Sequence, residues 1–498
     1  MNKFKTGYSQ LNKGYGVLII YTGGTIGSMP KDRNDPDSPQ VVVSWEEFIG
    51  KSPLLKPESL GFNVDAYSTE PLDSCNLGPK EWREMANVIH ECYDKYEGFV
   101  ILHGTDTMVN TASVLSFMLE NLSKPVIITG AQMTYLFNVR NDGWQNLVTA
   151  LMIANPKYSG IPIVPEVCIY FGQKLMRGNR TRKINATGFN AYTSPNYKPL
   201  ATIGDYIEVD ESLLLKKSTK PLKVKSKLNT DVVPIYFFPG IQDSKVLQNI
   251  LSDKNLKGVV LLSYGSGNIP TDQHVLDMIK KAHDRGVVFY NVTQTGGGRV
   301  ELGMYETSAL LLDVGVISGI DITPEAALVK MEVLLGDEDL NQKEIENMAQ
   351  QDLAGEMSLS IFTTLFNDKD NPQVDSKYKR FRIPATNIQG FNKIGEGKLD
   401  RIMLRFRDGV FSNPNEDGYI NIKLYADLSS DDELNIDSIN YLGSFNKLPN
   451  DKPTMAIFDI TESAKKVLSP RSSFTVVLDS TDGIFSWSSV ELALYAQS

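Results

Sequence analysis

The feature that most constrains the fold is a regular alternation of short apolar runs and helical patterns over residues 16–335. The apolar runs are almost continuous in valine, isoleucine, leucine, phenylalanine and tyrosine, which is typical of parallel strands covered on both faces. Strands that alternate with helices predict a doubly wound α/β architecture. The predicted strands cover residues 17–21, 98–102, 125–129, 167–171, 233–237, 259–263 and 287–292.

Residues 195–230 interrupt this alternation with prolines and many lysines. We interpret them as a linker, with room for a short hairpin of its own, between an N-terminal catalytic domain (residues 1–194) and a second α/β domain (residues 231–360). A length of 498 residues allows about three domains. The predicted helices cover residues 80–95, 107–121, 144–154, 245–251, 271–285, 323–335 and 341–351.

The pattern changes after about residue 366, where polar and apolar residues alternate in short segments bounded by Asn, Asp, Gly and Pro. This pattern predicts an antiparallel β-sandwich, and we expect an accessory domain over residues 375–498 with one short helix at 461–467. Its predicted strands cover residues 379–383, 398–406, 419–425, 435–445, 453–459, 473–479 and 487–495.

Composition excludes several classes of function. Fifty basic and 60 acidic residues give a net charge of −10, which disfavours binding to nucleic acid or to anionic membranes. The four histidines show no metal-ligand spacing, so we expect no metal site and no cofactor. No apolar run reaches about 18 residues and the N-terminus lacks the apolar core of a signal peptide. Because three unpaired cysteines indicate a reducing compartment, we expect a cytoplasmic protein.

Two glycine-containing loops follow predicted strands. The first reads TGGTIG (residues 22–27), and it lacks both the G-x-G-x-x-G and the Gly-Lys-Ser/Thr spacing of nucleotide-binding loops. The second reads HGTDT (residues 103–107). Taken singly, each also fits a structural role, as a turn or as an N-cap before a helix. Because ligands bind beyond the carboxyl ends of parallel strands, two hydroxyl-bearing loops there indicate an acyl-transfer site.

A third segment, residues 177–185, is rich in arginine and lysine and follows the strand predicted at 167–171. Such a run is usually a solvated surface. A lysine that is desolvated at such a place loses its proton more readily and can serve as a base. The residues alone leave both interpretations open.

Together these segments resemble the bacterial-type L-asparaginases, specifically the cytoplasmic type I branch. The resemblance covers about the first 350 residues and implies two doubly wound α/β domains of the asparaginase type, assembled as a homodimer or homotetramer. It also implies hydrolysis of the side-chain amide of L-asparagine, a small-molecule substrate. The matching stretches are YTGGTIG (21–27), ILHGTDTM (101–108), PVIITGAQ (125–132), RGNRTRK (177–183), SYGSGNIP (263–270) and GVISGIDITPEAA (315–327).

The resemblance also implies catalytic roles. Thr25 would be the nucleophile that forms an acyl-enzyme and releases ammonia. Lys183 would act as base through Thr105, with Asp106 orienting it. Asp106 would also hold the substrate α-amino group, and the backbone N–H of Thr105 would help bind the oxyanion.

Substrate contacts follow from the same resemblance. Asp73 and Ser74 match the loop that binds the substrate α-carboxylate, with Ser74 the better candidate, although a serine at this position alone would suggest a turn. Ala131 matches a position whose backbone lines the leaving amide. Asn268 matches an asparagine that reaches the active site of the neighbouring subunit.

The sequence departs from the family pattern in its activating tyrosine and its allosteric arginine. The loop at residues 28–43 contains no tyrosine, so Tyr305 is our candidate activator, and a core aromatic role for it is equally compatible. Leu262 stands where allosteric relatives have an arginine, and Arg182 precedes the catalytic lysine where they often have threonine. Without the guanidinium clamp at 262, we expect weak or absent cooperativity.

Two alternative functions stay open. The first is an amidase of the same fold that acts on glutamine, peptide-linked asparagine or another amide, recruited by the C-terminal domain. The second is a binding module without catalysis. Intact Thr25, Thr105, Asp106 and Lys183 argue against the second alternative.

Overall fold

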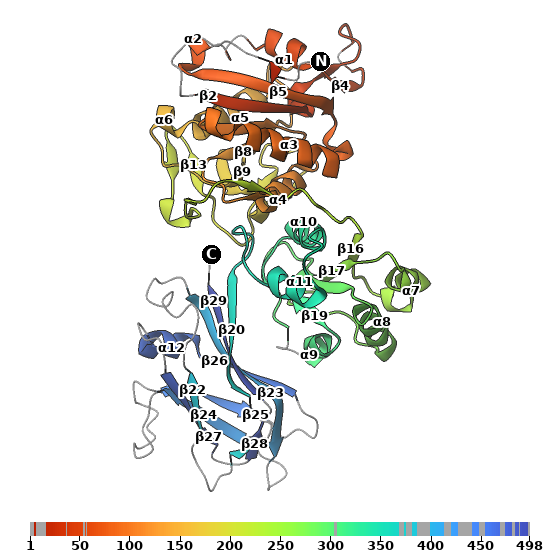
Figure 1. Cartoon of the computed structure of the whole chain (residues 1–498), viewed down its shortest axis with the longest axis vertical. Coiled ribbons are helices and arrows are strands. Elements are labelled where there is room, and N and C mark those ends of the chain that lie inside the picture. The colour runs from red at the N-terminus through yellow and green to blue at the C-terminus, as the bar shows by residue number, and fades with distance from the viewer. Residues whose placement is uncertain are drawn as a thin grey trace.

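The computed structural model shows two α/β units followed by a set of antiparallel strands (Figure 1). In the orientation of Figure 1 the N-terminal unit lies at the top, the second unit below it and the C-terminal strands at the bottom. Within the described ranges, no helix combines the length and apolar character needed to cross a bilayer. The structure describes residues 4–5, 16–35, 37–52, 55, 57–302, 306–367, 373–374, 381–385, 399–412, 420–426, 441–447, 454–468, 474–480, 484–487 and 489–496.

The N-terminal unit is built on a nine-stranded sheet in the order β1-β5-β2-β6-β8-β9-β10-β13-β14. Its five central strands, from β5 to β9, are parallel. Strand β2 has β5 on one side and β6 on the other, so the strand order reverses at the carboxyl ends of β2 and β6. Sheets of this kind bind ligands at such a switch point, and we call this place the crevice. The strands are β1 (Phe4–Lys5), β2 (Gly16–Gly23), β5 (Asn63–Leu72), β6 (Gly98–Leu102), β8 (Val126–Thr129), β9 (Val167–Phe171), β10 (Lys174–Arg177), β13 (Ala201–Ile203) and β14 (Ile207–Val209).

Helices cover both faces of this sheet. Helices α3 (Pro79–Cys92) and α4 (Met108–Met118) share one apolar cluster with the sheet, and α5 (Gly143–Ala154) belongs to the cluster on the other face. Both faces of the parallel strands are therefore buried, as their continuous apolar runs predict. Shorter elements are β3 (Ser28–Pro30), β4 (Gln40–Val42), α1 (Trp45–Gly50), α2 (Pro57–Leu60), β7 (Leu119–Glu120), α6 (Pro156–Ser159), β11 (Arg182–Lys183), β12 (Tyr192–Thr193) and β15 (Lys223–Val224).

Five strands of this sheet were not among the predicted strands: β1, β5, β10, β13 and β14. Strand β5 was not predicted, because Asp65, Ser68 and Glu70 interrupt its apolar run. Strands β13 and β14 form a short hairpin of the kind allowed for in the predicted linker, but this hairpin joins the N-terminal sheet, because β13 pairs with β10. This hairpin joins the sheet because Leu200 and Ala201 are buried in its apolar core.

The second unit contains four parallel strands in chain order: β16 (Val232–Tyr236), β17 (Gly258–Ser263), β18 (Val288–Thr293) and β19 (Val316–Ser318). Helices α7 (Lys245–Ser252), α8 (Gln273–His283) and α9 (Glu306–Asp313) pack on one face. Helices α10 (Pro324–Leu335) and α11 (Gln342–Ala349) pack on the other. Helix α10 also contacts α4, so it lies at the junction of the two units (Figure 1).

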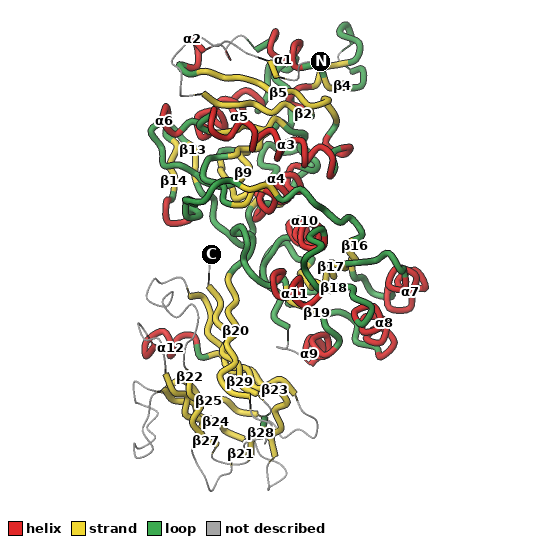
Figure 2. The backbone as a smooth tube through the Cα atoms, in the orientation of Figure 1, coloured by secondary structure: helices red, strands yellow, loops and turns green. Residues whose placement is uncertain are grey.

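The C-terminal strands form two antiparallel sheets, drawn in yellow at the bottom of Figure 2. Side chains from both sheets, including Phe406 and Leu424, share one buried apolar cluster. The six-stranded sheet contains β20 (Leu359–Asn367), β21 (Gln373–Val374), β23 (Leu399–Ser412), β26 (Thr454–Asp459), β28 (Ile484–Ser486) and β29 (Ser489–Ala496). The four-stranded sheet contains β22 (Phe381–Ala385), β24 (Ile420–Ala426), β25 (Tyr441–Lys447) and β27 (Phe474–Ser480), and helix α12 (Thr461–Leu468) follows β26.

Candidate active site

The loops that follow β2, β5 and β6 meet backbone to backbone. Gly24 has a φ of 79°, and a Cβ atom on it would lie 2.3 Å from the Cα of Gly104. A Cβ atom on Gly104 would lie 2.6 Å from the Oγ of Ser74. Only glycine allows such close approaches, and the positive φ of Gly24 adds to that requirement. The two glycines therefore bring together the loops that carry Thr25, Thr105 and Ser74.

Lys183 lies next to Thr105 and Asp106, as the sequence predicts. It belongs to β11, which pairs with β12. Its Nζ lies 2.9 Å from Thr105 Oγ1 and 2.7 Å from Asp106 Oδ1. The lysine side chain is 16% exposed and that of Asp106 is 66% exposed, so the cluster opens to solvent on the carboxylate side. A neutral lysine here could accept the proton of the Thr105 hydroxyl.

Thr25 begins a short 3-10 turn, Thr25–Gly27, directly after the glycines. The Ser28 hydroxyl fixes this turn by donating to the carbonyl of Gly24 at 2.9 Å, and Thr134 Oγ1 donates to Ile26 O at 3.1 Å. Within the described residues, the Thr25 hydroxyl has no hydrogen-bond partner. A fixed backbone that carries an uncommitted hydroxyl suits a nucleophile that reacts with a bound ligand.

Ser74 and Asp73 have different surroundings. Ser74 is 1% exposed, and its Oγ has no hydrogen-bond partner among the described residues. Thr107 Oγ1 donates to the carbonyl of Ser74 at 2.7 Å and so fixes this loop. Asp73 is exposed, and its carboxylate accepts the N–H of Cys75 as the cap of the next turn. A buried polar atom without a partner is rare in proteins, so Ser74 is the better candidate for a ligand contact.

Ala131 is fully buried in a loop that two polar residues hold. The Asp142 carboxylate accepts the N–H groups of Gln132 and Met133 at 3.1 and 3.0 Å. Asn146 Nδ2 donates to the carbonyl of Gly130 at 3.0 Å. Neither Asp142 nor Asn146 was predicted from the sequence, because Asp142 stands directly before a helix and would be assigned as its N-cap. Instead, its carboxylate caps no backbone N–H of that helix, and it accepts only the Asn146 side chain there, at 3.3 Å.

Tyr192 is a third supporting residue that was not predicted from the sequence. It lies on β12, is buried, and packs edge-on against Phe171 with ring centroids 4.9 Å apart. Its hydroxyl donates to the carbonyl of Thr105. Burial raises the pKa of Tyr192 well above its ordinary value, so the hydroxyl keeps the proton that it donates.

His103 orients the peptide bond between Gly104 and Thr105. Trp82 Nε1 donates to Thr111 Oγ1 at 2.9 Å, so the Thr111 hydroxyl proton is free to donate to His103 Nε2, also at 2.9 Å. His103 Nδ1 then donates to the carbonyl of Gly104 at 2.6 Å. Burial lowers the pKa of His103 to about 4, which keeps the ring neutral. In a trans peptide, this contact points the Thr105 N–H away from His103.

The arginines of the RGNRTRK segment have a structural role. Arg177 Nη1 and Arg180 Nε donate to the carbonyl of Gly355 at 3.1 and 2.8 Å, and Asn179 Nδ2 donates to Ala354 O at 2.9 Å. This segment therefore connects the strand that carries Lys183 to residues that follow α11 in the second unit. Arg182 pairs with Glu325 at 3.2 Å.

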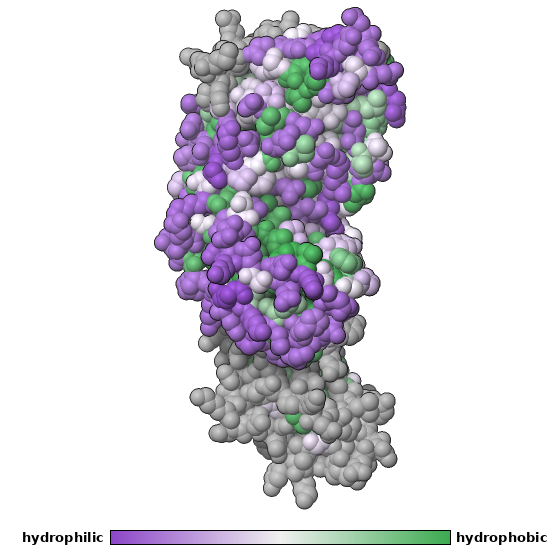
Figure 3. All heavy atoms as spheres, turned by 90° about the vertical axis from the view of Figure 1, so that its right-hand side faces the viewer, coloured by the Kyte–Doolittle hydropathy of each residue, from purple (hydrophilic) through white to green (hydrophobic). Residues whose placement is uncertain are grey.

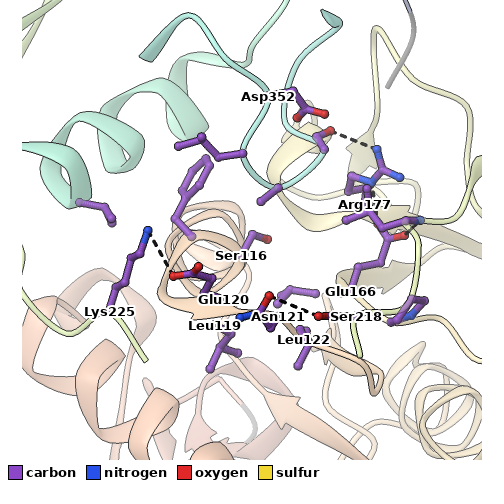
Figure 4. Close-up of a pocket in the computed structure, with 18 of the residues that line it drawn as sticks. Ser116, Leu119, Glu120, Asn121, Leu122, Glu166, Arg177, Ser218, Lys225 and Asp352 are labelled. Carbon is purple, nitrogen blue, oxygen red and sulfur yellow. Dashed lines mark hydrogen bonds and ion pairs between the residues drawn. The ribbon is translucent and has the colours of Figure 1, made fainter. Parts of the chain in front are cut away.

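A cavity of about 530 Å³ lies between the two units (Figure 4). Arg177, Glu166 and Asp352 line it, and Arg177 is paired with Glu166 at 2.5 Å. Burial raises the pKa of Asp352 to about 7. The cavity lining contains none of the residues that we predicted for catalysis or substrate binding. It is therefore separate from the crevice that holds Thr25 and Lys183.

Two predicted residues lie apart from this cluster. Asn268 follows β17 in the second unit, and its Oδ1 accepts a hydrogen bond from Thr307 Oγ1 at 2.8 Å. In the described part of the single chain, no hydrogen bond joins Asn268 to Thr25, Thr105, Asp106 or Lys183. Tyr305 lies outside the described residues.

Comparison with known proteins identifies the family. Residues 16–215 match the family model described as "Asparaginase, N-terminal", and residues 231–348 match the "Glutaminase/Asparaginase C-terminal domain". The chain belongs to the asparaginase family. The predicted membership and the paired α/β fold of the asparaginase family are thereby confirmed.

Individual members of the asparaginase family agree with this assignment. L-asparaginase 1 of Escherichia coli K12 is 39% identical over 343 residues, which are 69% of this chain and 98% of that protein. A 60 kDa lysophospholipase of Mus musculus is 36% identical over 372 residues, which are 71% of this chain and 64% of that protein. The crystal structure of L-asparaginase I from Vibrio cholerae superposes with a TM-score of 0.61 at 39% identity, covering 69% of this chain and 99% of its own.

Proposed function

We propose that this chain is an L-asparaginase that hydrolyses the side-chain amide of L-asparagine to L-aspartate and ammonia through an acyl-enzyme on Thr25. The observation that carries the proposal is the contact of Lys183 Nζ with Thr105 Oγ1 and Asp106 Oδ1, beside the loop of Thr25. Membership of the asparaginase family and the similarity to L-asparaginase 1 support the choice of substrate.

In the first half of the reaction, Thr25 Oγ1 attacks the side-chain amide carbon of asparagine and forms a C–O bond. Its proton passes through the Thr105 hydroxyl to the neutral amine of Lys183, while Asp106 holds that amine in place. The Thr105 N–H, which the His103–Gly104 hydrogen bond directs away from His103, stabilises the oxyanion. We call this path through Thr105 to Lys183 the relay. The C–N bond then breaks, and the departing nitrogen takes a proton from the relay and leaves as ammonia.

In the second half, a water molecule attacks the acyl carbon of the Thr25 ester. The same relay accepts one proton from this water, and the C–O bond to Thr25 breaks. The threonine oxygen regains its proton, and aspartate is released. The relay ends in the protonation state in which it began.

Substrate placement follows from the charges of the crevice. The unpartnered Ser74 hydroxyl would donate to the substrate α-carboxylate, beside the Asp73 turn. Asp106, which is largely exposed, would hold the α-amino group. The backbone of Ala131 would line the leaving amide in a loop fixed by Asp142.

We also propose the following organisation. Residues 1–194 form the main part of one domain, to which the β13–β14 hairpin adds, and residues 231–360 form the second domain. Residues 375–498 form a β-sandwich to which strands β20 and β21 also contribute, and the shared apolar core of the two C-terminal sheets supports it. A homodimer or homotetramer is supported by Tyr236, Phe238 and Val246 of the second unit, which are more than half exposed. A cytoplasmic location is supported by the free cysteines Cys75, Cys92 and Cys168. Figure 3 shows a mainly hydrophilic face on which apolar side chains gather near the middle.

The test is ammonia release from a panel of asparagine, glutamine and asparagine-containing peptides, with Thr25→Ala as the comparison. We expect release from asparagine and its loss in Thr25→Ala. Equal activity in Thr25→Ala would overturn the nucleophile assignment. Release only from glutamine or peptides would favour an amidase for another substrate, and no release from any amide would favour a binding module.

A further inference from the structure

We propose that the six-stranded C-terminal sheet supports helix α9 and thereby orients Asn268, so that Arg405 and Thr307 are positioning residues for the substrate site. This inference rests on the proposed function and on the expectation, implied by the family resemblance, that Asn268 reaches the active site of a neighbouring subunit. It gives a role to strands that lie beyond residue 348, the last residue that the family models match.

The first step concerns the two faces of β23. Residues in a strand point alternately to opposite faces, and Leu404 and Phe406 belong to the apolar core between the two C-terminal sheets. Met403 and Arg405 therefore lie on the opposite face. Both are buried, and Arg405 is only 6% exposed. Since arginine is almost never buried without a partner, this outer face must be covered by another part of the chain.

The second step identifies what covers this face. Arg405 Nη2 donates to the carbonyl of Leu302 at 3.3 Å, and Leu302 belongs to the apolar core of the second α/β unit. Strand β26, which pairs with β23, contacts helix α9, which begins four residues after Leu302. Figure 1 shows α9 at the lower side of the second unit, next to the C-terminal strands. The six-stranded sheet therefore contacts both Leu302, which precedes α9, and the helix itself.

The third step connects α9 to Asn268. Thr307, in the first turn of α9, donates from Oγ1 to Asn268 Oδ1 at 2.8 Å. The backbone on the other side is already fixed, because Asn268 bridges with Tyr264 and Asn291 Nδ2 donates to Gly267 O at 2.9 Å. The rotation of the Asn268 side chain is then set by Thr307. An amide whose oxygen is held in this way presents its two N–H donors to an acceptor on the other side.

This geometry predicts an effect on substrate binding. A carboxylate or amide oxygen of the substrate would accept from Asn268 only when the amide has the orientation that Thr307 gives it. If the Asn268 amide is free to rotate, the enzyme should bind the substrate and the transition state more weakly to the same extent. This raises KM and leaves kcat nearly unchanged.

The experiment uses full-length variants and steady-state ammonia release. Thr307→Val removes the hydroxyl but keeps the shape, and we expect a KM for asparagine about fivefold higher, with kcat changed by less than about twofold. Thr307→Ser should restore the original KM. Arg405→Met should also raise KM, as Thr307→Val does. Its effect should not add to that of Thr307→Val in the double variant, because both act through one hydrogen bond.

A control and a second measurement separate positioning from general damage. Ser444→Ala breaks an exposed hydrogen bond to Asn421 in the other C-terminal sheet, so it should leave KM unchanged. Hydrogen exchange across residues 306–313 should be faster in Arg405→Met and unchanged in Ser444→Ala. If Arg405→Met does not fold, Arg405→Lys replaces it, since it keeps the charge without the guanidinium geometry and should shift KM in the same direction.

Three results would overturn the inference: an unchanged KM in both Thr307→Val and the Arg405 variant, additive effects in the double variant, or unchanged exchange across α9. These outcomes differ from a failure of the proposed function, which appears as no ammonia release from the unmodified chain. The exchange measurement needs no catalysis, so it tests the mechanical link in either case.

Discussion

Glu332 provides a test of how the junction between the two α/β units responds to pH. It lies in the last turn of α10, is 8% exposed, and has one carboxylate oxygen without a hydrogen-bond partner among the described residues. Burial raises its pKa from 4.5 to about 7. The carbonyl end of a helix also disfavours a negative charge. Glu332→Gln keeps the shape of the side chain and removes the charge.

The size of the effect follows from this pKa. Because the folded chain keeps the Glu332 proton up to about pH 7 and the unfolded chain releases it near 4.5, the free energy of unfolding falls as pH rises between these values. Near pH 8, where Glu332 is ionised in both the folded and the unfolded chain, the rise in pKa lowers the free energy of unfolding by about 3 kcal/mol. At pH 5 the raised pKa lowers the free energy of unfolding by only about 1 kcal/mol, because the Glu332 carboxyl of the folded chain is still neutral.

The assay is thermal unfolding of the full chain and of Glu332→Gln, each at pH 5 and pH 8. The variant should gain about 5 °C in Tm at pH 8 and much less at pH 5. Asp352, whose pKa burial also raises to about 7, contributes equally to both proteins, so the difference between them reports Glu332. A Tm difference that is the same at both pH values would refute the reasoning.

Three further predictions concern the site and its support. Lys183→Met should lower kcat by about 10²- to 10⁴-fold in ammonia release, whereas Arg182→Met, its neighbour on β11, should stay active; equal losses would contradict the base assignment. Ser74→Ala should raise KM about tenfold, and an unchanged KM would count against a carboxylate contact. Lys330 and Glu356 are fully buried and 2.5 Å apart, so Lys330→Met should lower the free energy of unfolding by about 3–5 kcal/mol in denaturant titrations. Adding Glu356→Gln should recover part of that loss, and no recovery would show that the unpaired charge is not the cause.

Much of the fold was predictable because burial on both faces leaves a direct trace in the sequence. The residues of β6 and β9 form uninterrupted apolar runs, and their predicted bounds agree with the structure. Strand β5 leaves a weaker trace in the sequence, since among the described residues its neighbour β1 pairs only with Tyr67 and Ala66 along its outer edge. Polar residues are tolerated along the rest of β5, so no apolar run identifies it.

The site was predictable in part. Residues that bear the reacting groups stand in short motifs, and the structure brings Thr105, Asp106 and Lys183 together. Their supports, Tyr192 and Asp142, were missed, because each acts through a backbone contact that any tyrosine or aspartate could make. Such a contact depends on distances between loops, and periodicity or spacing in one sequence does not encode them.

The link between the RGNRTRK segment and residues 354–355 has a consequence for synthesis on the ribosome. The carbonyls that Arg177, Asn179 and Arg180 bind belong to Ala354 and Gly355, about 175 residues further along the chain. An N-terminal unit that emerges first can form its central sheet, yet the segment leading to Lys183 still lacks these acceptors. The active site is therefore expected to form only after Gly355 has emerged from the ribosome. An incomplete chain would then be unable to hydrolyse amides in the cell.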